Sequence, residues 1–386
     1  MDSNDFLGSV AQENVSFTTR VVHTTRVGDN FWKVMIFVEN DRFVDSSADT
    51  WTDVPGSSTL KALTVTARDY AEHTTGLLRS WLYDLFCNNF SGDCILVACG
   101  AKIEDASDTF ISGMEAAYDL LKAYAYHKTC CVCSGATETL VPAVAVALAK
   151  KCAEDKGLLS AAPYFSFTTA TPTQPTTDPI YSALTTNNVD AFMAAHQDAT
   201  RNAGLYSLGL AMGTVNGSGT CVGNSFDMER SSMITPSGPD GTNLPKSTRD
   251  SLNTLNIQIF KPIGDNSGAV TAIGASTLQG TVVQATWISA YVTYMTKVAI
   301  AQLITSGNFL KNAANYSRIV TVMGSYLAAF GPAGSGRLER LAITAPAFEA
   351  LPESSGDQIV VPDAWSAYYV DQVRDVQITG TLYIGV

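Results

Sequence analysis

Two segments near the N-terminus, residues 17–26 and 31–38, have a β-like pattern of apolar and polar residues, with a turn at residues 27–30 between them. Alternation with a period of two places one set of side chains on one face of a β-strand. These segments predict an N-terminal arm over residues 1–58 that folds as a β-hairpin or as two extended segments. The apolar positions assigned to the strands of this arm are Val21, Val22, Trp32, Val34 and Ile36.

Strand and helix patterns alternate over residues 59–170. Short apolar runs predict buried strands, and apolar residues that recur every three or four positions predict amphipathic helices. Units of strand, helix and strand connect parallel neighbours, so this region predicts an α/β core with mostly parallel strands. The predicted strands are 60–67, 94–99, 129–133 and 161–168, and the predicted helices are 69–88, 111–126 and 140–156.

Glycine, serine, proline and asparagine are concentrated within residues 171–246, which predicts a loop-rich insertion that faces outward. One segment of this insertion, residues 189–203, can form a helix. Regular patterns return over 247–375, a second core region. Its predicted helices are 247–255, 286–306 and 316–329, and its predicted strands are 257–260, 269–273, 338–343 and 358–361.

The last segment of the chain, residues 376–386, alternates apolar with polar or small side chains as far as the final residue. Chain ends are usually frayed unless something holds them, so a terminal strand needs a sheet edge, in its own domain or in a neighbouring copy. We interpret this segment as a strand exchanged with a neighbouring subunit. Its apolar positions are Val376, Ile378, Leu382, Ile384 and Val386. The predicted fold class is therefore α/β, with a layered mixed-sheet core, long helices in the C-terminal half and extended terminal β-arms.

Composition narrows the choice of partner and compartment. With 386 residues and 46% apolar content, the chain can fill two or three cores. The net charge is −12, and no block of Lys or Arg interrupts the acidic background, so a nucleic-acid backbone is a poor partner and a basic protein surface or tube is a better one. No apolar run reaches membrane-span length, and the acidic N-terminus is unlike a secretory signal. We expect a soluble protein made in a cytoplasm.

The motifs of common enzymes and of metal sites are missing from the sequence. Eight cysteines lie mostly in apolar runs, where free cysteine behaves as a small hydrophobe, and Cys130, Cys131 and Cys133 lack the partners of a zinc site. The four histidines are isolated from one another, no phosphate loop or nucleophile elbow is present, and no glycine-rich turn opens a helix as in dinucleotide-binding folds. We expect no catalytic residue, cofactor or metal.

Four segments of the C-terminal half together resemble contractile tail sheath proteins of bacteriophages and related injection machines. Residues 247–260, STRDSLNTLNIQIF, are similar to a sheath segment in which a short helix with a Leu-Asn step leads into a strand. Residues 269–278 resemble the strand and turn that follow, with Ser276 where arginine is common. Trp287 and Ile288 open the long helix as a Trp-Ile pair does in that family, and residues 363–386 resemble its closing segment.

This resemblance implies a structural protein, not an enzyme. Copies of the chain would stack as six-membered rings around a tail tube protein and exchange their terminal strands with neighbours. They would contract by rigid-body rotation to drive tube penetration and genome delivery. Baseplate and tail terminator proteins would be further partners, with no direct contact to nucleic acid and no membrane span. The protein would be part of the virion, assembled in the host cytoplasm.

Two alternatives stay open at this point. Another virion structural protein, such as a tail tube, capsid or fibre subunit, shares the acidic composition without enzyme motifs, although a tube subunit is normally smaller and richer in strands. An α/β enzyme with a cysteine nucleophile, Cys99 or Cys133, is the second alternative, because a thiol near a helix N-terminus can be activated.

Overall fold

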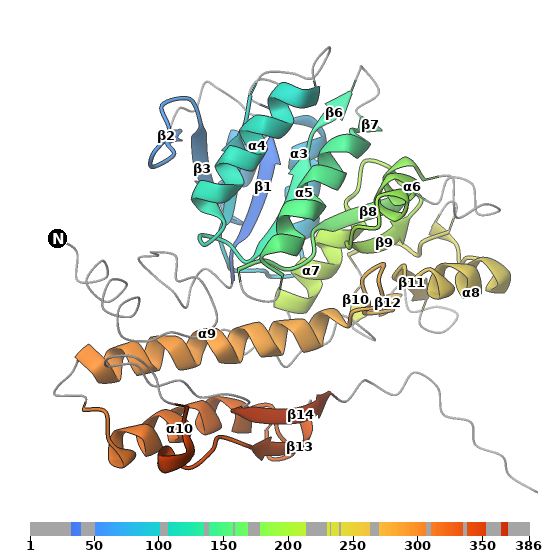
Figure 1. Ribbon diagram of the computed structural model, residues 1–386. Coiled ribbons are helices and arrows are strands. Elements are labelled where there is room, and N and C mark those ends of the chain that lie inside the picture. Colours follow the sequence, from blue (N-terminus) through green and yellow to red (C-terminus); the bar gives the residue numbers. More distant parts are fainter. Residues whose placement is uncertain are drawn as a thin grey trace, which may run out of the picture.

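The computed structural model describes residues 32–39, 51–100, 107–134, 139–156, 159–168, 178–213, 230–231, 233–238, 241–262, 270–305, 310–334, 338–352 and 364–369. These residues form an α/β structure with mixed sheets, which confirms the predicted fold class. An α/β body makes up most of the structure. The long helix α9 (Val283–Thr305) runs along this body and separates it from a smaller unit of one helix and two strands (Figure 1).

The central sheet of the body has the strand order β2-β3-β4-β1-β5. Strand β1 is parallel to β4 and β5, whereas β3 is antiparallel to β4 and β2 is antiparallel to β3. The predicted parallel arrangement therefore holds at β4, β1 and β5, which are buried at every position because helices cover both faces. In sheet order the strands are β2 (Thr52–Asp53), β3 (Lys61–Val65), β4 (Cys94–Ala98), β1 (Val34–Val38) and β5 (His127–Cys131).

Strand β1 divides its side chains between two hydrophobic cores. Val34 and Ile36 belong to the core that also contains residues of α3 (Gly76–Phe86), α7 (Ala203–Gly213) and α9. Met35 and Phe37 belong to the core under α4 (Ser107–Leu121) and α5 (Pro142–Glu154). Successive residues of a strand point to opposite faces, so one short apolar run fills both cores.

This position differs from the N-terminal arm to which the sequence analysis assigned Trp32, Val34 and Ile36. The physical reason is that β1 is apolar at all of its positions, a pattern typical of a strand buried on both faces rather than of an exposed arm. Trp32 precedes β1 and packs its ring 6.1 Å from that of Tyr291 on α9. Val21 and Val22 lie outside the described residues.

Helices cover the two faces of the central sheet. Helices α3 (Gly76–Phe86) and α7 (Ala203–Gly213) pack on one face, and α4 (Ser107–Leu121) and α5 (Pro142–Glu154) pack on the other. The helix predicted at 69–88 is divided into α2 (Tyr70–His73) and α3, because the intervening backbone at Thr74 and Thr75 is extended.

A parallel strand pair, β8 (Tyr164–Thr168) and β9 (Phe192–His196), extends the body beyond β5. The sequence pattern predicted a helix over residues 189–203, but Phe192–His196 within this segment form strand β9. Alanine and methionine favour helix locally, but the β9 backbone pairs with β8 and also with Gln258, whose N–H donates to Met193 O at 3.0 Å. Tertiary pairing outweighs local propensity here.

Helix α6 (Pro179–Thr186) begins inside the segment assigned to the loop-rich insertion. Asp178 caps it by accepting hydrogen bonds from Ile180 N and Tyr181 N, both at 2.9 Å. Further along the chain, the predicted helix and strands near 247–273 are present as α8, β11 and β12. The remaining elements of the body are β6 (Cys133–Ser134), β7 (Thr139–Leu140), β10 (Arg230–Ser231), α8 (Lys246–Thr254), β11 (Ile259–Pro262) and β12 (Val270–Ile273).

The smaller unit follows α9 in the sequence. It contains α10 (Ala313–Ala328), β13 (Leu338–Ile343), a short 3-10 helix (Phe348–Ala350) and β14 (Trp365–Tyr369). The helices predicted at 286–306 and 316–329 and the strand at 338–343 are confirmed by α9, α10 and β13. The strands predicted at 358–361 and 376–386 lie outside the described residues.

Candidate assembly site

The smaller unit presents a short antiparallel sheet made of β13 and β14. Leu338 pairs with Tyr369 and Ile343 pairs with Trp365, and the register shifts between Glu339 and Ala342. Arg340 lies in this irregular stretch with a left-handed φ of 49°, a conformation typical of a β-bulge. Among the described residues this sheet contains only these two strands, so its outer edges have no strand partner there.

Backbone and side-chain contacts hold this two-stranded sheet against α10. Leu338 N donates to Phe330 O at 2.8 Å, just after α10 ends, and Tyr316 Oη donates to Pro346 O at 2.7 Å. Thr344 N donates to Ala364 O at 3.0 Å, which keeps the two strands paired where β13 ends and β14 begins. Glu339, Arg340 and Ala342 of β13 are exposed, whereas the side chain of Ile343 lies near Gly324 on α10 and is 42% exposed. The sheet is thus fixed in place on its inner side and accessible on its outer side.

Helix α9 is anchored to the body by Trp287, whose side chain is fully buried. Its ring lies 4.5 Å from the ring of His127 at the start of β5. His127 Nδ1 is 3.1 Å from Tyr164 Oη, so the aromatic contact is linked to a buried hydrogen bond. Large buried aromatic side chains dominate packing energies, so this cluster fixes the first turns of α9 to the body.

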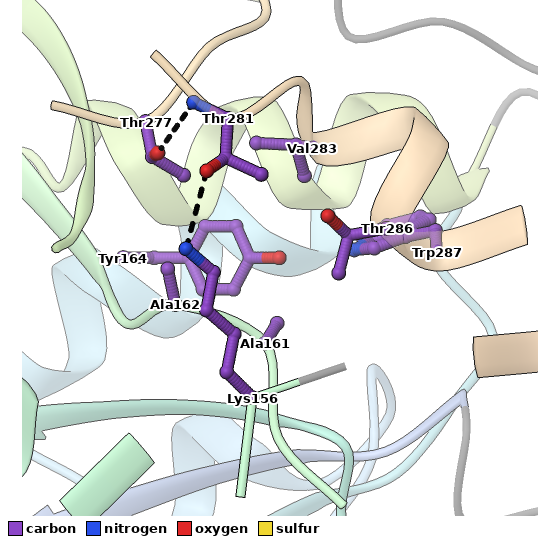
Figure 2. A pocket seen from close by; sticks show the side chains of 9 residues that line it. All are labelled: Lys156, Ala161, Ala162, Tyr164, Thr277, Thr281, Val283, Thr286 and Trp287. Carbon is purple, nitrogen blue, oxygen red and sulfur yellow. Dashed lines mark hydrogen bonds between the residues drawn. The ribbon is translucent and has the colours of Figure 1, made fainter. Parts of the chain in front are cut away.

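A polar cluster centred on Asp190 attaches the segment before α9 to the body, and Figure 2 shows three of its members, Lys156, Thr277 and Thr281, near Trp287. Asp190 Oδ2 accepts from Lys156 Nζ at 2.6 Å and from Thr277 Oγ1 at 2.9 Å, and its Oδ1 accepts from Gln279 N at 3.0 Å. Lys156 Nζ also lies 3.2 Å from Thr281 Oγ1, across a small pocket lined by Tyr164 and Trp287. One carboxylate therefore connects the strand β9 region to the turn that leads into α9.

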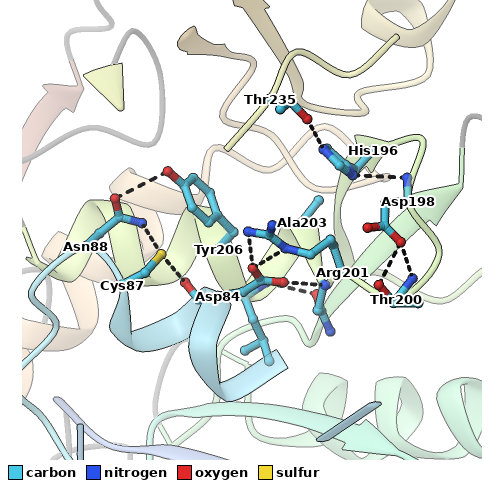
Figure 3. Close-up of polar contacts among 12 residues, drawn as sticks. Asp84, Cys87, Asn88, His196, Asp198, Thr200, Arg201, Ala203, Tyr206 and Thr235 are labelled. Carbon is cyan, nitrogen blue, oxygen red and sulfur yellow. Dashed lines mark hydrogen bonds and ion pairs between the residues drawn. The ribbon is translucent and has the colours of Figure 1, made fainter. Parts of the chain in front are cut away.

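A second buried charge connects α3 to α7 (Figure 3). Asp84 is fully buried on α3, forms an ion pair with Arg201 and accepts from Asn202 N at 2.8 Å. Burial raises the pKa of the Asp84 carboxyl to about 6, although Arg201 and the Asn202 N–H act in the opposite direction. Nearby, Tyr206 Oη donates to Asn88 Oδ1 at 3.3 Å. These contacts stabilise the helix pair on one face of the sheet.

The cysteines considered as nucleophiles are buried in the core. Cys99 is 4% exposed and Cys133 is 1% exposed, and burial raises the pKa of the Cys99 thiol well above its ordinary value. Helix α5 begins at Pro142, so Cys133 is not placed at its N-terminus. An activated nucleophile needs an accessible thiolate with a lowered pKa, and this arrangement does not supply one at Cys99.

Within the part of the chain that the structure describes, no group of three His, Cys, Asp or Glu side chains could hold a metal ion. None of the helices described there has the length and apolarity needed to cross a membrane.

The residues predicted to mediate assembly lie in different parts of the structure, and some of them lie outside the described residues. Val34 and Ile36 are in the central sheet, Trp32 contacts α9, and the apolar positions of 376–386 lie outside the described residues. Sequence reasoning did not identify β14 as a separate strand, although Trp365, Ala367 and Tyr369 alternate with Ser366 and Tyr368 in a way that could have indicated it.

No protein-family model and no curated protein matches this chain. Among solved structures, the chain is similar to a chain in the cryo-EM structure of the anti-feeding prophage (AFP) baseplate, which was symmetrised sixfold. The TM-score is 0.58 with 12% sequence identity, and the match covers 93% of this chain and 94% of that chain. The likeness therefore concerns the whole fold, from the central sheet through to the smaller unit, and at this identity it concerns the fold alone.

Proposed function

We propose that this protein is the structural subunit of a contractile tail sheath. The observation that carries the proposal is the likeness of nearly the whole chain to a chain of a sixfold baseplate, with a TM-score of 0.58. The resemblance of four C-terminal segments to sheath proteins supports the same assignment. In this account six copies form a ring, rings stack around a tail tube protein, and baseplate and tail terminator proteins close the two ends.

The two-stranded sheet of the smaller unit is the proposed acceptor of strands from neighbouring copies. A sheet of two strands is marginally stable by itself, and exposed strand edges readily pair with another chain. The donor strand is residues 376–386, with an N-terminal arm strand that contains Val21 and Val22 as the second candidate. Strand addition forms main-chain hydrogen bonds that hold subunits together while their bodies change orientation.

Contraction in this proposal is a rotation of rigid subunits. The aromatic cluster at Trp287 and the polar cluster at Asp190 fix α9 to the body, so the body and the start of α9 would turn as one piece. Head-to-tail contacts that do not close on themselves build helical filaments, and rigid-body rotation at such contacts changes the length of the filament. The extended terminal arms would keep neighbours connected during this change.

Negative-stain microscopy and sedimentation of the full chain test the assignment. We expect hollow sleeves or stacked rings from the wild-type protein and dispersed subunits from copies that lack residues 376–386. A matched pair of variants separates strand pairing from general damage. Serine at Ile378, Leu382 and Ile384 should abolish assembly, whereas serine at Gln377, Thr379 and Thr381 on the alternate face should preserve it. Normal assembly of the deletion variant would contradict strand exchange.

A baseplate subunit is a second candidate function, because the similar solved structure is that of a baseplate. The two assignments differ in the assembled object. A sheath subunit forms sleeves of many stacked rings, whereas a baseplate subunit forms single closed rings or requires other components to assemble. Single rings that never stack at any protein concentration would favour the baseplate.

A further inference from the structure

Basic and acidic residues are divided unevenly along this chain. Residues 283–352, which include α9, α10 and β13, contain five Lys or Arg and two Asp or Glu, a formal net charge of +3. The whole chain has a net charge of −12, so the remaining residues, with 19 basic and 34 acidic side chains, carry −15. The basic segment ends at residue 352, since residues 353–386 contain one Arg and five Asp or Glu, a formal net charge of −4.

The beginning of α10 presents two of the three basic side chains that are described as exposed within residues 283–352; the third is Arg340 on β13, next to exposed Glu339. The helix contains Arg318 and no acidic residue, and Lys311 lies directly before its N-cap, Asn312. Both cationic side chains are exposed. Leu310 is next to Lys311 and is 63% exposed, the largest exposure among the large apolar side chains that the structure describes. We call Leu310, Lys311 and Arg318 the basic α10 surface.

Helix α4 on the body has the opposite character. It contains Asp108, Glu115 and Asp119 and neither Lys nor Arg. Asp119 is exposed and lies 3.3 Å from Lys151 Nζ, a lysine that is shared with Glu154 at 3.5 Å, and Lys122, directly after the helix, is paired with Asp155 at 2.9 Å. Leu120 beside Asp119 is 39% exposed. We call Glu115, Asp119 and Leu120 the acidic α4 surface.

These two surfaces lie at opposite ends of the molecule. Helix α4 covers the face of the central sheet that points away from α9, whereas α10 lies on the far side of α9 from the body (Figure 1). The two surfaces therefore cannot meet within one subunit. A contact between them in two copies is heterologous, the class of contact that continues from copy to copy in rings and filaments.

We propose that the basic α10 surface of one copy docks on the acidic α4 surface of a second copy. This inference rests on the proposed function, because it names the contact that orients subunits in the assembly. Opposite charges steer the encounter and select the partner surface, and the exposed leucine on each side supplies apolar area to the centre of the contact. Strand exchange then holds together subunits that the charged contact has oriented.

Complementary charge reversal tests the contact directly. Copies with K311E/R318E carry two acidic surfaces, and copies with E115K/D119K carry two basic ones, so neither variant should assemble alone. An equimolar mixture restores both opposite-charge contacts in an alternating order and should assemble like the wild type. The wild-type protein should also require about tenfold more protein to assemble when the ionic strength is raised from about 0.05 M to about 0.5 M. A matched variant, R68E/R79E, changes the net charge equally at exposed arginines of the body and should assemble normally.

Each outcome decides the proposal. Assembly by the mixture, and by neither variant alone, supports it and also shows that both variants fold. Failure of the mixture, with both variants retaining the wild-type melting temperature, overturns it. An equal loss of assembly in K311E/R318E and R68E/R79E also overturns it. The net charge of the chain, and not the basic α10 surface, would then control assembly. Sleeves that are indifferent to salt and to both reversals would overturn this inference and leave the proposed function standing, whereas wild-type protein that stays monomeric at every salt concentration would overturn both.

Discussion

Arg201 forms an ion pair with Asp84, and the Asp84 side chain is fully buried between α3 and α7 (Figure 3). The pair brings together residues that are far apart in the sequence. The pair contributes to the stability of the fold only when both partners are present, because a buried carboxylate that loses its cation is strongly destabilising.

The raised pKa of Asp84 gives a prediction with a definite sign. Its folded-state pKa of about 6 lies above the value of about 3.9 for an unfolded aspartate, so the folded protein binds a proton more tightly. The contribution of Asp84 to the free energy of unfolding is therefore full below about pH 4 and is lost as the pH rises through about 6. When the free energy of unfolding is measured in urea from about pH 4 to about pH 7, the value for the wild type should fall relative to that for Asp84→Asn as the pH rises. Parallel curves would contradict the assigned pKa.

Removing the cation from the same pair extends this test. Arg201→Met should lower the free energy of unfolding by about 3–5 kcal/mol near pH 8, because it leaves a buried charge without its partner. The loss should be smaller near pH 5, where Asp84 takes up a proton. Arg68→Met, at an exposed arginine, should change the free energy by less than about 0.5 kcal/mol.

Two helical glycines should respond in opposite directions to alanine. A Cβ atom at Gly209 in α7 would lie 2.1 Å from Leu85 O, so Gly209→Ala forces α7 away from α3 and should destabilise the fold. At Gly324 in α10 the nearest atom is 3.8 Å away, an ordinary contact, so Gly324→Ala should stabilise by about 0.4–1 kcal/mol. Thermal unfolding of both variants checks the pair. Similar effects at the two positions would show that helix α7 does not approach α3 as closely as described.

Trp287 should be the most sensitive single position in α9. Truncation to alanine removes a fully buried ring that contacts His127, and should lower the free energy of unfolding by about 3–5 kcal/mol. Leu310→Ala, at an exposed residue, serves as the comparison and should have an effect below about 0.5 kcal/mol. Equal effects in urea unfolding would mean that Trp287 does not anchor α9.

Thiol reactivity tests the enzyme alternative. In a Cys221→Ser background, Cys99 and Cys133 should react with an alkylating reagent only as fast as the protein unfolds, because both are buried. Half-buried Cys87 provides an internal reference and should react first. Rapid modification of Cys99 or Cys133 in the folded protein would revive the proposal of a cysteine nucleophile.

Much of the fold could be predicted from periodic patterns. Buried strands such as β4 and the apolar runs of α9 and α10 give strong local signals, so their type and approximate bounds were correct. Helix α7 was missed because it is buried all round and Ser207 is its one polar residue between Leu205 and Met212, so the sequence shows no apolar stripe beside a polar face. Helix α6 did carry a usable signal, Asp178 as N-cap followed by Pro179, which the surrounding threonines and prolines obscured.

The position of β1 in the sheet and the buried polar contacts of the candidate site could not be predicted from local sequence patterns, because both depend on long-range contacts. Whether an apolar strand such as Val34–Val38 joins its own sheet or a neighbour's is decided by long-range pairing, here with β4 and β5. The Asp84–Arg201 pair and the Asp190 cluster join segments that are distant in the sequence, so only the folded chain reveals them. The apolar terminal positions from Val376 to Val386 stay a prediction.

A cryo-EM reconstruction of the assembled 386-residue chain would distinguish strand exchange between copies from self-contained subunits. We expect sixfold rings in which density for residues 376–386 of one copy pairs along the edge of the β13–β14 sheet of a neighbouring copy. A reconstruction in which that segment returns to its own subunit, and in which the β13–β14 sheet receives no strand from any neighbour, would contradict the account.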